Sequence, residues 1–259
     1  MKMSDLCKHS LNSLHKELCH TPRPHIVEWM RSNDSAFCRA LVSNGYLTDE
    51  QMCRAAERYR LGITRDGGVI FWQIDENQTT RDGKIMFYST DCHRDHSRHP
   101  SWASARLKQH QLLPQEFQPS HCLFGLHLLG SEEGRVESEK TAVDGDSSNS
   151  WSETKTVCVV ESEKTAVILS EHFTQYLWMA SGGLTMLTAA MLQPLLGRKT
   201  ILFPDTDPEG KAYQLWRDVA ATASEALGHT ITVSPVLEQH ATTHQKCRKI
   251  DLVDFLFHK

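Results

Sequence analysis

The sequence lacks any long hydrophobic run. No apolar stretch among its 259 residues approaches the ~20 residues that a helical membrane span needs. The opening segment MKMSDLCKHS also lacks the apolar core of a secretory signal. We therefore expect a cytoplasmic protein with no membrane partner. Hydrophobic residues make up 39% and charged residues 23%, which excludes the collagen-like, fully disordered and disulfide-scaffold classes.

Two short motifs are also missing. None of the eight cysteines has CxxC spacing, so the sequence does not predict a zinc ribbon, and the scattered thiols are typical of a reduced, intracellular chain. The string GxxxxGK[ST] does not occur, which excludes a P-loop nucleotidase. Histidines 93, 96 and 99 alternate with Arg94 and Arg98, a pattern that we interpret as a cationic loop contacting phosphate in preference to a metal site.

An excess of charge of one sign is absent as well. The net charge of −4 gives no global electrostatic case for nucleic acid. The charge is nevertheless uneven: residues 1–110 carry 16 basic and 13 acidic groups, residues 111–155 carry 3 and 8, and residues 156–259 carry 9 and 11. This distribution indicates two lobes joined by an acidic connector.

The first part of the chain predicts a polar leader over residues 1–34, rich in His and Cys, and then a small α+β lobe over residues 35–129. Apolar residues recur at helical spacing from Ser35 to Leu61. Within this stretch Thr48-Asp-Glu-Gln51 fits a capping box, so we expect two short helices.

A β-hairpin should follow these helices. The β-rich run 69–74 and the strand-like run 84–88 are separated by polar residues that end in the turn dipeptide Asp82-Gly83. We expect a hairpin with a nine-residue loop over residues 75–83. A short apolar element at residues 122–129 ends the lobe.

Residues 130–155 are rich in Ser, Glu and Asp and predict an acidic, flexible linker. The linker contains a duplication: VESEKTAV occurs at residues 136–143 and again at residues 160–167. Only the second copy follows an apolar strand. Because a functional site needs a rigid scaffold, we interpret the first copy as a solvated duplicate.

The segment 156–259 alternates apolar strands with helices, which predicts an α/β domain with a parallel sheet flanked by helices on both faces. The expected strands are 156–160, 177–183, 199–207 and 229–236, and the expected helices are 163–176, 184–196, 209–227 and 250–257.

Three carboxylates follow these strands directly. Glu161 comes after the strand TVCVV, and Asp205 and Asp207 come after ILFP. Because the carboxyl ends of parallel strands meet at one edge of a sheet, these groups should converge into an oxygen site suited to Mg²⁺. Gly210 and the start of the next helix would add N–H donors for an anion. The alternative is that an Asp here only caps that helix.

This order of elements, with Glu161 after one strand and Asp205-x-Asp207-x-x-Gly210 after another, resembles the TOPRIM domain of bacterial primases, topoisomerases and some nucleases. In primases the Glu is usually followed by Gly, whereas here it is followed by Ser162. The form VESEKTA is similar to primase-related proteins of bacterial mobile elements. Residues 249–256, KIDLVDFL, resemble the KDxxD-type helix that closes many such domains.

A weaker resemblance extends upstream. Residues 83–88 and 122–129 look like pieces of the polymerase subdomain that precedes TOPRIM in primases, which implies that Lys84 faces a template or nucleotide phosphate. A primase zinc module needs CxxC pairs, and the sequence has none.

The resemblance implies a primase-like, Mg²⁺- or Mn²⁺-dependent nucleotidyltransferase that acts on single-stranded DNA and nucleoside triphosphates during replication of a mobile element, with a replicative helicase as a further partner. Glu161, Asp205 and Asp207 would bind the metal and act in catalysis, and the nucleotide or nucleic acid would be bound by Lys84, Lys164, Gly210 and Lys211. Two alternatives stay open: a TOPRIM nuclease that cleaves phosphodiesters, and a non-catalytic nucleic-acid-binding remnant.

Overall fold

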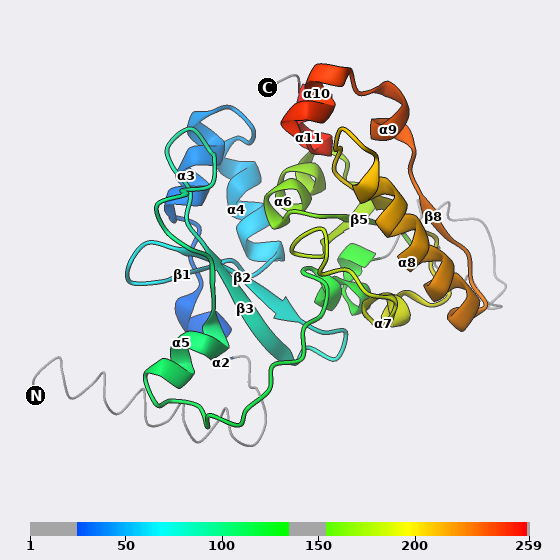
Figure 1. Cartoon of the computed structure of the whole chain (residues 1–259). Helices are drawn as coiled ribbons and strands as arrows, with labels where there is room; N and C mark the ends of the chain where they lie inside the picture. The colour runs from blue at the N-terminus through cyan, green and yellow to red at the C-terminus, as the bar shows by residue number, and fades with distance from the viewer. Residues whose placement is uncertain (1–24, 135–153, 258–259) are drawn as a thin grey trace, which may run out of the picture. The chain divides into compact units, whose positions relative to one another are not determined.

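The computed structural model describes residues 25–134 and 154–257, which divide into two units (Figure 1). The first unit ends at Leu126 and the second begins at His127. The first VESEKTAV copy and most of the Cys/His-rich leader lie outside the described residues. None of the helices in the described ranges is long and apolar enough to cross a membrane.

The first unit is built around an antiparallel sheet with the strand order β1-β2-β3-β4. Its strands are β1 (Gly62–Ile63), β2 (Val69–Ile74), β3 (Thr80–Met86) and β4 (Ser101–Trp102), and its helices are α2 (His25–Met30), α3 (Ala36–Ser43), α4 (Asp49–Arg58) and α5 (Ala103–Gln109).

Strand β2 is buried along its whole length because both faces of the sheet are covered. Alternate side chains of a strand point to opposite faces. Ile70, Trp72 and Ile74 pack in a cluster with Ile26 and Val27 of α2. On the opposite face of the sheet, Phe71 makes edge-to-face contacts with the ring of Phe37 on α3 and with that of Phe124. The range predicted as a polar leader therefore ends in a helix, α2, that belongs to this core.

The two predicted helices after Ser35 are present, and the capping box is confirmed. The Thr48 side chain accepts a hydrogen bond from the Gln51 N–H, and the Gln51 side chain accepts one from the Thr48 N–H. This reciprocal pair satisfies two donors that helix geometry leaves without intrahelical partners.

The hairpin loop is shorter than predicted, and the expectation of a nine-residue loop is wrong. Strand β3 starts at Thr80, so Asp82 and Gly83 lie inside the ladder, opposite Gln73 and Trp72. The turn is made instead by Asp75, whose carboxylate accepts the N–H groups of Asn77 and Thr79. Gly83 is required by packing, because a Cβ there would lie 2.7 Å from the Trp72 ring.

The second unit contains a four-stranded sheet with the order β6-β5-β7-β8, and all of its pairings are parallel, as predicted. Its strands are β5 (Thr156–Val160), β6 (Tyr176–Ala180), β7 (Thr200–Phe203) and β8 (Ile231–Val233). The protein is therefore a mixed α/β protein with one antiparallel and one parallel sheet.

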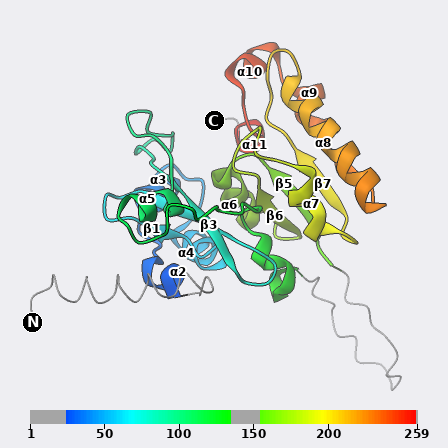
Figure 2. The ribbon, with the colours of Figure 1, turned by 60° about the horizontal axis from the view of Figure 1, so that its bottom comes forward.

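Helices cover both faces of the parallel sheet (Figures 1 and 2). Helix α6 lies on one side, packed against β6, and helix α8 lies on the other, packed against β8. The helices of this unit are α6 (Glu163–His172), α7 (Ala189–Leu192), α8 (Lys211–Leu227), α9 (Val236–His240), α10 (Thr243–Arg248) and α11 (Leu252–Phe257), with short 3-10 turns η1 (Leu126–Gly130), η2 (Glu132–Gly134) and η3 (Gln193–Leu195).

The predicted helix over residues 184–196 is wrong for most of its length. Residues 181–188 form a loop, and only the four-residue α7 and the turn η3 follow. The loop is held by Trp216 of α8, whose Nε1–H donates to the Leu184 carbonyl at 3.0 Å. Helices α9 and α10 were not predicted, because their sequence lacks a continuous apolar stripe.

Residues 127–134 pack with the second unit. Arg198, just before β7, donates from its guanidinium to the carbonyls of Leu129 and Gly134, at 2.8 and 3.0 Å. The sequence alone places these residues at the end of the first lobe and in the linker. The two hydrogen bonds from Arg198 to the carbonyls of Leu129 and Gly134 attach residues 127–134 to the unit of the parallel sheet instead.

Candidate active site

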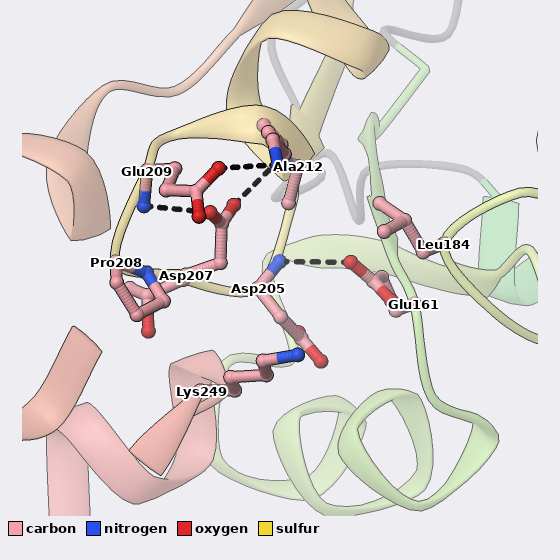
Figure 3. A pocket seen from close by; sticks show the side chains of 10 residues that line it. Glu161, Leu184, Asp205, Asp207, Pro208, Glu209, Ala212 and Lys249 are labelled. Atoms are coloured by element: carbon pink, nitrogen blue, oxygen red, sulfur yellow. Dashed lines mark hydrogen bonds and ion pairs between the residues drawn. The ribbon is translucent and has the colours of Figure 1, made fainter. Parts of the chain in front are cut away.

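Glu161 and Asp205 meet at the carboxyl edge of the parallel sheet. They follow β5 and β7, which are hydrogen-bonded neighbours with Val160 opposite Phe203. The backbone N–H of Asp205 donates to Glu161 Oε1 at 3.2 Å, a contact drawn in Figure 3. Two of the three predicted site carboxylates are thus adjacent because adjacent parallel strands end at the same level.

Burial raises the pKa values of both groups, and neighbouring negative charges raise them further. Burial raises the pKa of Glu161 to about 6, and the charges of Asp251 and Asp207 contribute in the same direction. The pKa of Asp205 is raised well above its usual value by burial first and then by the charge of Glu161. The ionised pair is therefore costly without a compensating cation.

Asp207, the third predicted carboxylate, caps a helix. Its carboxylate accepts the backbone N–H groups of Glu209 and Ala212, at 2.8 and 2.7 Å, and so caps the first turn of α8 (Figure 3). Burial opposes ionisation of Asp207, but these hydrogen bonds outweigh it and lower the pKa of the group. The capping interpretation therefore describes Asp207, whereas it does not describe Asp205.

Gly210, predicted to contact an anion, lies at the start of the helix that Asp207 caps. Gly210 is the N-cap of α8 in a left-handed conformation, with φ of 69°, which a glycine adopts without strain. The donors of the first turn face the Asp207 carboxylate, so this helix end already holds a negative charge of the protein.

Two further acids were not predicted as site residues. Asp251 is buried and accepts a hydrogen bond from Thr165 Oγ1 at 2.5 Å and another from the Asp254 N–H at 2.8 Å. Burial and the charge of Asp251 raise the pKa of Asp254. Both charges also act on Asp205. The DxxD spacing in the closing helix was the available signal, but spacing alone does not reveal that α11 packs on α6 next to Glu161.

The predicted basic residues occupy different environments. Lys164, in the first turn of α6, lies close enough to Asp205 and Asp254 for its charge to lower both pKa values. Lys211 forms an ion pair with Glu209 on the surface. Lys84 lies in the first unit, on β3, opposite Phe71 and Trp102.

A pocket of about 510 Å³ opens over these groups. It is lined by acidic, basic and apolar residues from the ends of β5 and β7, from α8 and from the segment after α10: Glu161, Leu184, Asp205, Thr206, Asp207, Pro208, Glu209, Lys211, Ala212 and Lys249 (Figure 3). Its volume lies within the range of small-molecule sites.

The carboxylates suit a hard cation whose remaining ligands are waters and phosphates of a bound molecule. Among residues 25–134 and 154–257, no three His, Cys, Asp or Glu side chains are grouped as a ready-made metal cage. Mg²⁺ in phosphate-handling sites is commonly held by one or two carboxylates, with waters and substrate phosphates as the other ligands. Glu161 and Asp205, two acids joined by the hydrogen bond from the Asp205 N–H and raised in pKa by burial and nearby negative charges, fit that requirement.

Comparisons with solved structures find primase domains at low similarity. The primase fragment of the bacteriophage T7 primase-helicase protein matches with a TM-score of 0.41 and 16% identity over 76% of this chain, and the chain spans 63% of that fragment. The DnaG primase catalytic domain bound to ssDNA matches with a TM-score of 0.45 and 16% identity over 97% of this chain and 84% of that domain.

No curated protein matches the chain significantly. A family model described as "Domain of unknown function (DUF6371)" matches residues 35–149 and 145–206, which together make up more than half of the chain. The chain therefore belongs to the DUF6371 family.

Proposed function

We propose that this protein is a primase-like enzyme of the TOPRIM type that carries out Mg²⁺-dependent nucleotidyl transfer on single-stranded DNA. The single observation that carries the proposal is the contact between Asp205 and Glu161 at the ends of two adjacent parallel strands. Its sequence counterpart is the TOPRIM-like order of Glu161, Asp205 and Asp207. Replication of a mobile element, with a replicative helicase as partner, is the setting that the VESEKTA resemblance supports.

The chemistry follows from the donor set. Glu161 and Asp205 would hold Mg²⁺ or Mn²⁺, and the ion would neutralise charge on the phosphates of a nucleoside triphosphate. With a pKa of about 6, Glu161 is also able to exchange a proton near neutral pH. Lys164 reduces the repulsion among the carboxylates, and Asp207 orients the loop by holding the start of α8.

The decisive experiment incubates the full chain with Mg²⁺ or Mn²⁺, nucleoside triphosphates and single-stranded DNA, and resolves the products on a gel. We expect new oligonucleotides from the wild type. Asp205→Asn and Glu161→Gln should each lower the rate by at least ~100-fold, because each removes a charge that the reaction requires. Glu225→Gln, at an exposed position near the other end of α8, is the matched control and should leave the rate unchanged.

Other outcomes separate the alternatives. Full activity of both site variants would contradict the catalytic proposal. Fragments of the template without synthesis would assign the same carboxylates to a nuclease, in which they position water for phosphodiester cleavage. Metal-independent DNA binding without any turnover would favour a non-catalytic remnant, an alternative that the capping role of Asp207 favours.

A further inference from the structure

Lys249 ends helix α10 in a conformation that is unusual for a residue with a side chain. Its φ and ψ are 54° and 52°, in the left-handed region, and its N–H caps the carbonyls of Gln245 and Lys246. Glycine or asparagine usually occupies this position, because a Cβ crowds the neighbouring carbonyl. Backbone strain of this kind persists only where surrounding contacts enforce it, and it clusters at functional sites.

The enforcing contacts come from the loop that carries the acids. Thr206, between Asp205 and Asp207, is buried, and both its N–H and its hydroxyl donate to the Ile250 carbonyl, at 3.0 and 3.2 Å. Lys249 is therefore attached to the acidic loop through the residue that follows it in the chain.

Helix α10 itself is held at its start and along one side. Thr242 and Gln245 form a capping box, and Lys246 contacts Glu238 of α9 at 2.5 Å. With these contacts before Lys249 and the Thr206 contact after it, the backbone of Lys249 is held at the edge of the pocket.

The Lys249 side chain lines the same pocket as Glu161 and Asp205. Figure 3 shows its amino group directed toward Asp205. Within the described part of the chain, no hydrogen bond or ion pair engages this amino group, whereas Lys211, the other lysine of the pocket, pairs with Glu209. An ammonium without an ion-pair partner in this part of the chain thus faces the pocket from the side of Asp205.

We propose that Lys249 binds a phosphate of the triphosphate substrate, next to the metal that Glu161 and Asp205 would hold. This inference rests on the proposed function for the metal. An ammonium binds phosphate as a mobile point charge, and a metal-bound phosphate between two acids needs a second cation to balance its charge. The alternative is that Lys249 only neutralises Asp205.

Binding measurements distinguish these two roles, because they predict changes of opposite kind. Isothermal titration calorimetry of the full chain would measure the affinity for Mg²⁺ alone and then, at saturating Mg²⁺, the affinity for inorganic tripolyphosphate. Lys249→Asn removes the charge and tolerates the left-handed backbone. It should weaken tripolyphosphate binding about tenfold, the loss of one charge-assisted hydrogen bond, and leave Mg²⁺ binding unchanged or tighter.

Two further variants control the measurement. Lys249→Arg keeps the charge and should stay within about threefold of the wild-type affinity for tripolyphosphate. Lys199→Asn removes an exposed lysine at the amino end of β7, the opposite edge of the sheet, and should change neither affinity.

The inference is overturned if Lys249→Asn binds tripolyphosphate like the wild type, if it loses Mg²⁺ and tripolyphosphate together, or if the wild type does not bind tripolyphosphate at all. Failure of the proposed function looks different. Tripolyphosphate binding that depends on Lys249, in a protein that synthesises no oligonucleotide, would contradict nucleotidyl transfer and leave the phosphate contact standing.

Discussion

The two units of this protein treat their buried carboxylates in opposite ways. In the antiparallel unit, Asp82 accepts hydrogen bonds from the N–H groups of Gly83 and Ser104 and from the Ser104 hydroxyl, at 2.7, 3.0 and 2.6 Å. In the parallel unit, Glu161 accepts one N–H, from Asp205, and burial together with nearby negative charges raises the pKa values of both acids.

The difference lies between an acid that the fold supplies with donors and a pair of acids that it leaves with few. A buried carboxylate whose oxygens accept hydrogen bonds from protein donors is satisfied by the fold and needs no ligand. A pair of acids held together with few donors destabilises the fold until a cation binds, and such perturbed pairs gather at functional sites. Both kinds of acid occur in one loop. The Asp207 carboxylate accepts the backbone N–H groups of Glu209 and Ala212, whereas Asp205 lines the pocket.

The largest effect on stability is expected from the structural acid. Asp82→Ala should lower the free energy of unfolding of the first unit by about 2–4 kcal/mol, because it leaves the buried donors of Ser104 without an acceptor. Urea unfolding measures the change as a lower midpoint at constant slope. Glu76→Ala, at an exposed position in the hairpin loop, is the control. A loss no larger than that of the control would remove the distinction between the two kinds of acid.

A smaller effect of opposite sign is expected from Glu161, an acid of the proposed site. Burial raises the pKa of Glu161 from 4.5 to about 6, so the folded protein binds this proton more tightly than the unfolded chain does. The contribution of Glu161 to the stability of the wild type should therefore be fully present below pH 4.5 and be lost as the pH rises through about 6. The charges of Asp251 and Asp207 oppose ionisation of Glu161, whereas the hydrogen bond from the Asp205 N–H favours it. The charge of Lys164 lowers the pKa of Asp205 and so favours its ionised form.

Glu161→Gln keeps an acceptor for the Asp205 N–H and lacks this titration. At pH 7.5 its free energy of unfolding should exceed that of the wild type by roughly 1 kcal/mol after allowance for solvent screening, which a higher melting temperature reports. At pH 4 the two proteins should be equally stable. Saturating Mg²⁺ should raise the wild-type melting temperature and leave that of the variant unchanged. A variant that is less stable than the wild type at pH 7.5 would mean that Glu161 is a structural acid like Asp82.

The smallest effect concerns the repeated motif. The second VESEKTAV copy carries Glu161 and Lys164 at the site, whereas the first has no apolar strand before it. Removing residues 136–143 should change the free energy of unfolding by less than about 0.5 kcal/mol, because shortening a long connection alters loop entropy only slightly. Thermal unfolding and oligonucleotide synthesis measure the result. A loss of either comparable to that of a site variant would mean that the first copy has a function.

Local patterns in the sequence were sufficient for several features of the structure. The capping box at Thr48 depends on residues three apart, and the parallel strands are continuous apolar runs between helical segments. Hydrophobic burial and hydrogen bonding over short distances determine such features. The adjacency of Glu161 and Asp205 followed as well, because strand ends in a parallel sheet converge by geometry.

Other features depended on contacts between distant segments. The hairpin turn is shorter than its turn dipeptide suggested, because Asp82 accepts hydrogen bonds from Ser104 and Gly83 packs against the Trp72 ring. Residues 184–188 form a loop because Trp216 holds the Leu184 carbonyl. Periodicity cannot report such partners, since they lie 11 to 32 residues away in the chain.

The sequence by itself determined which acids stand at the strand ends, because strand, acid and helix follow one another directly along the chain. Only the tertiary structure decided what each acid does. It directs Asp207 into the N–H groups of α8, leaves Asp205 beside Glu161, and brings Asp251 and Lys249 to them from a segment more than 40 residues later. The physical reason is that a carboxylate's role depends on the donors and charges around it, and these come together only when the helices pack on the sheet.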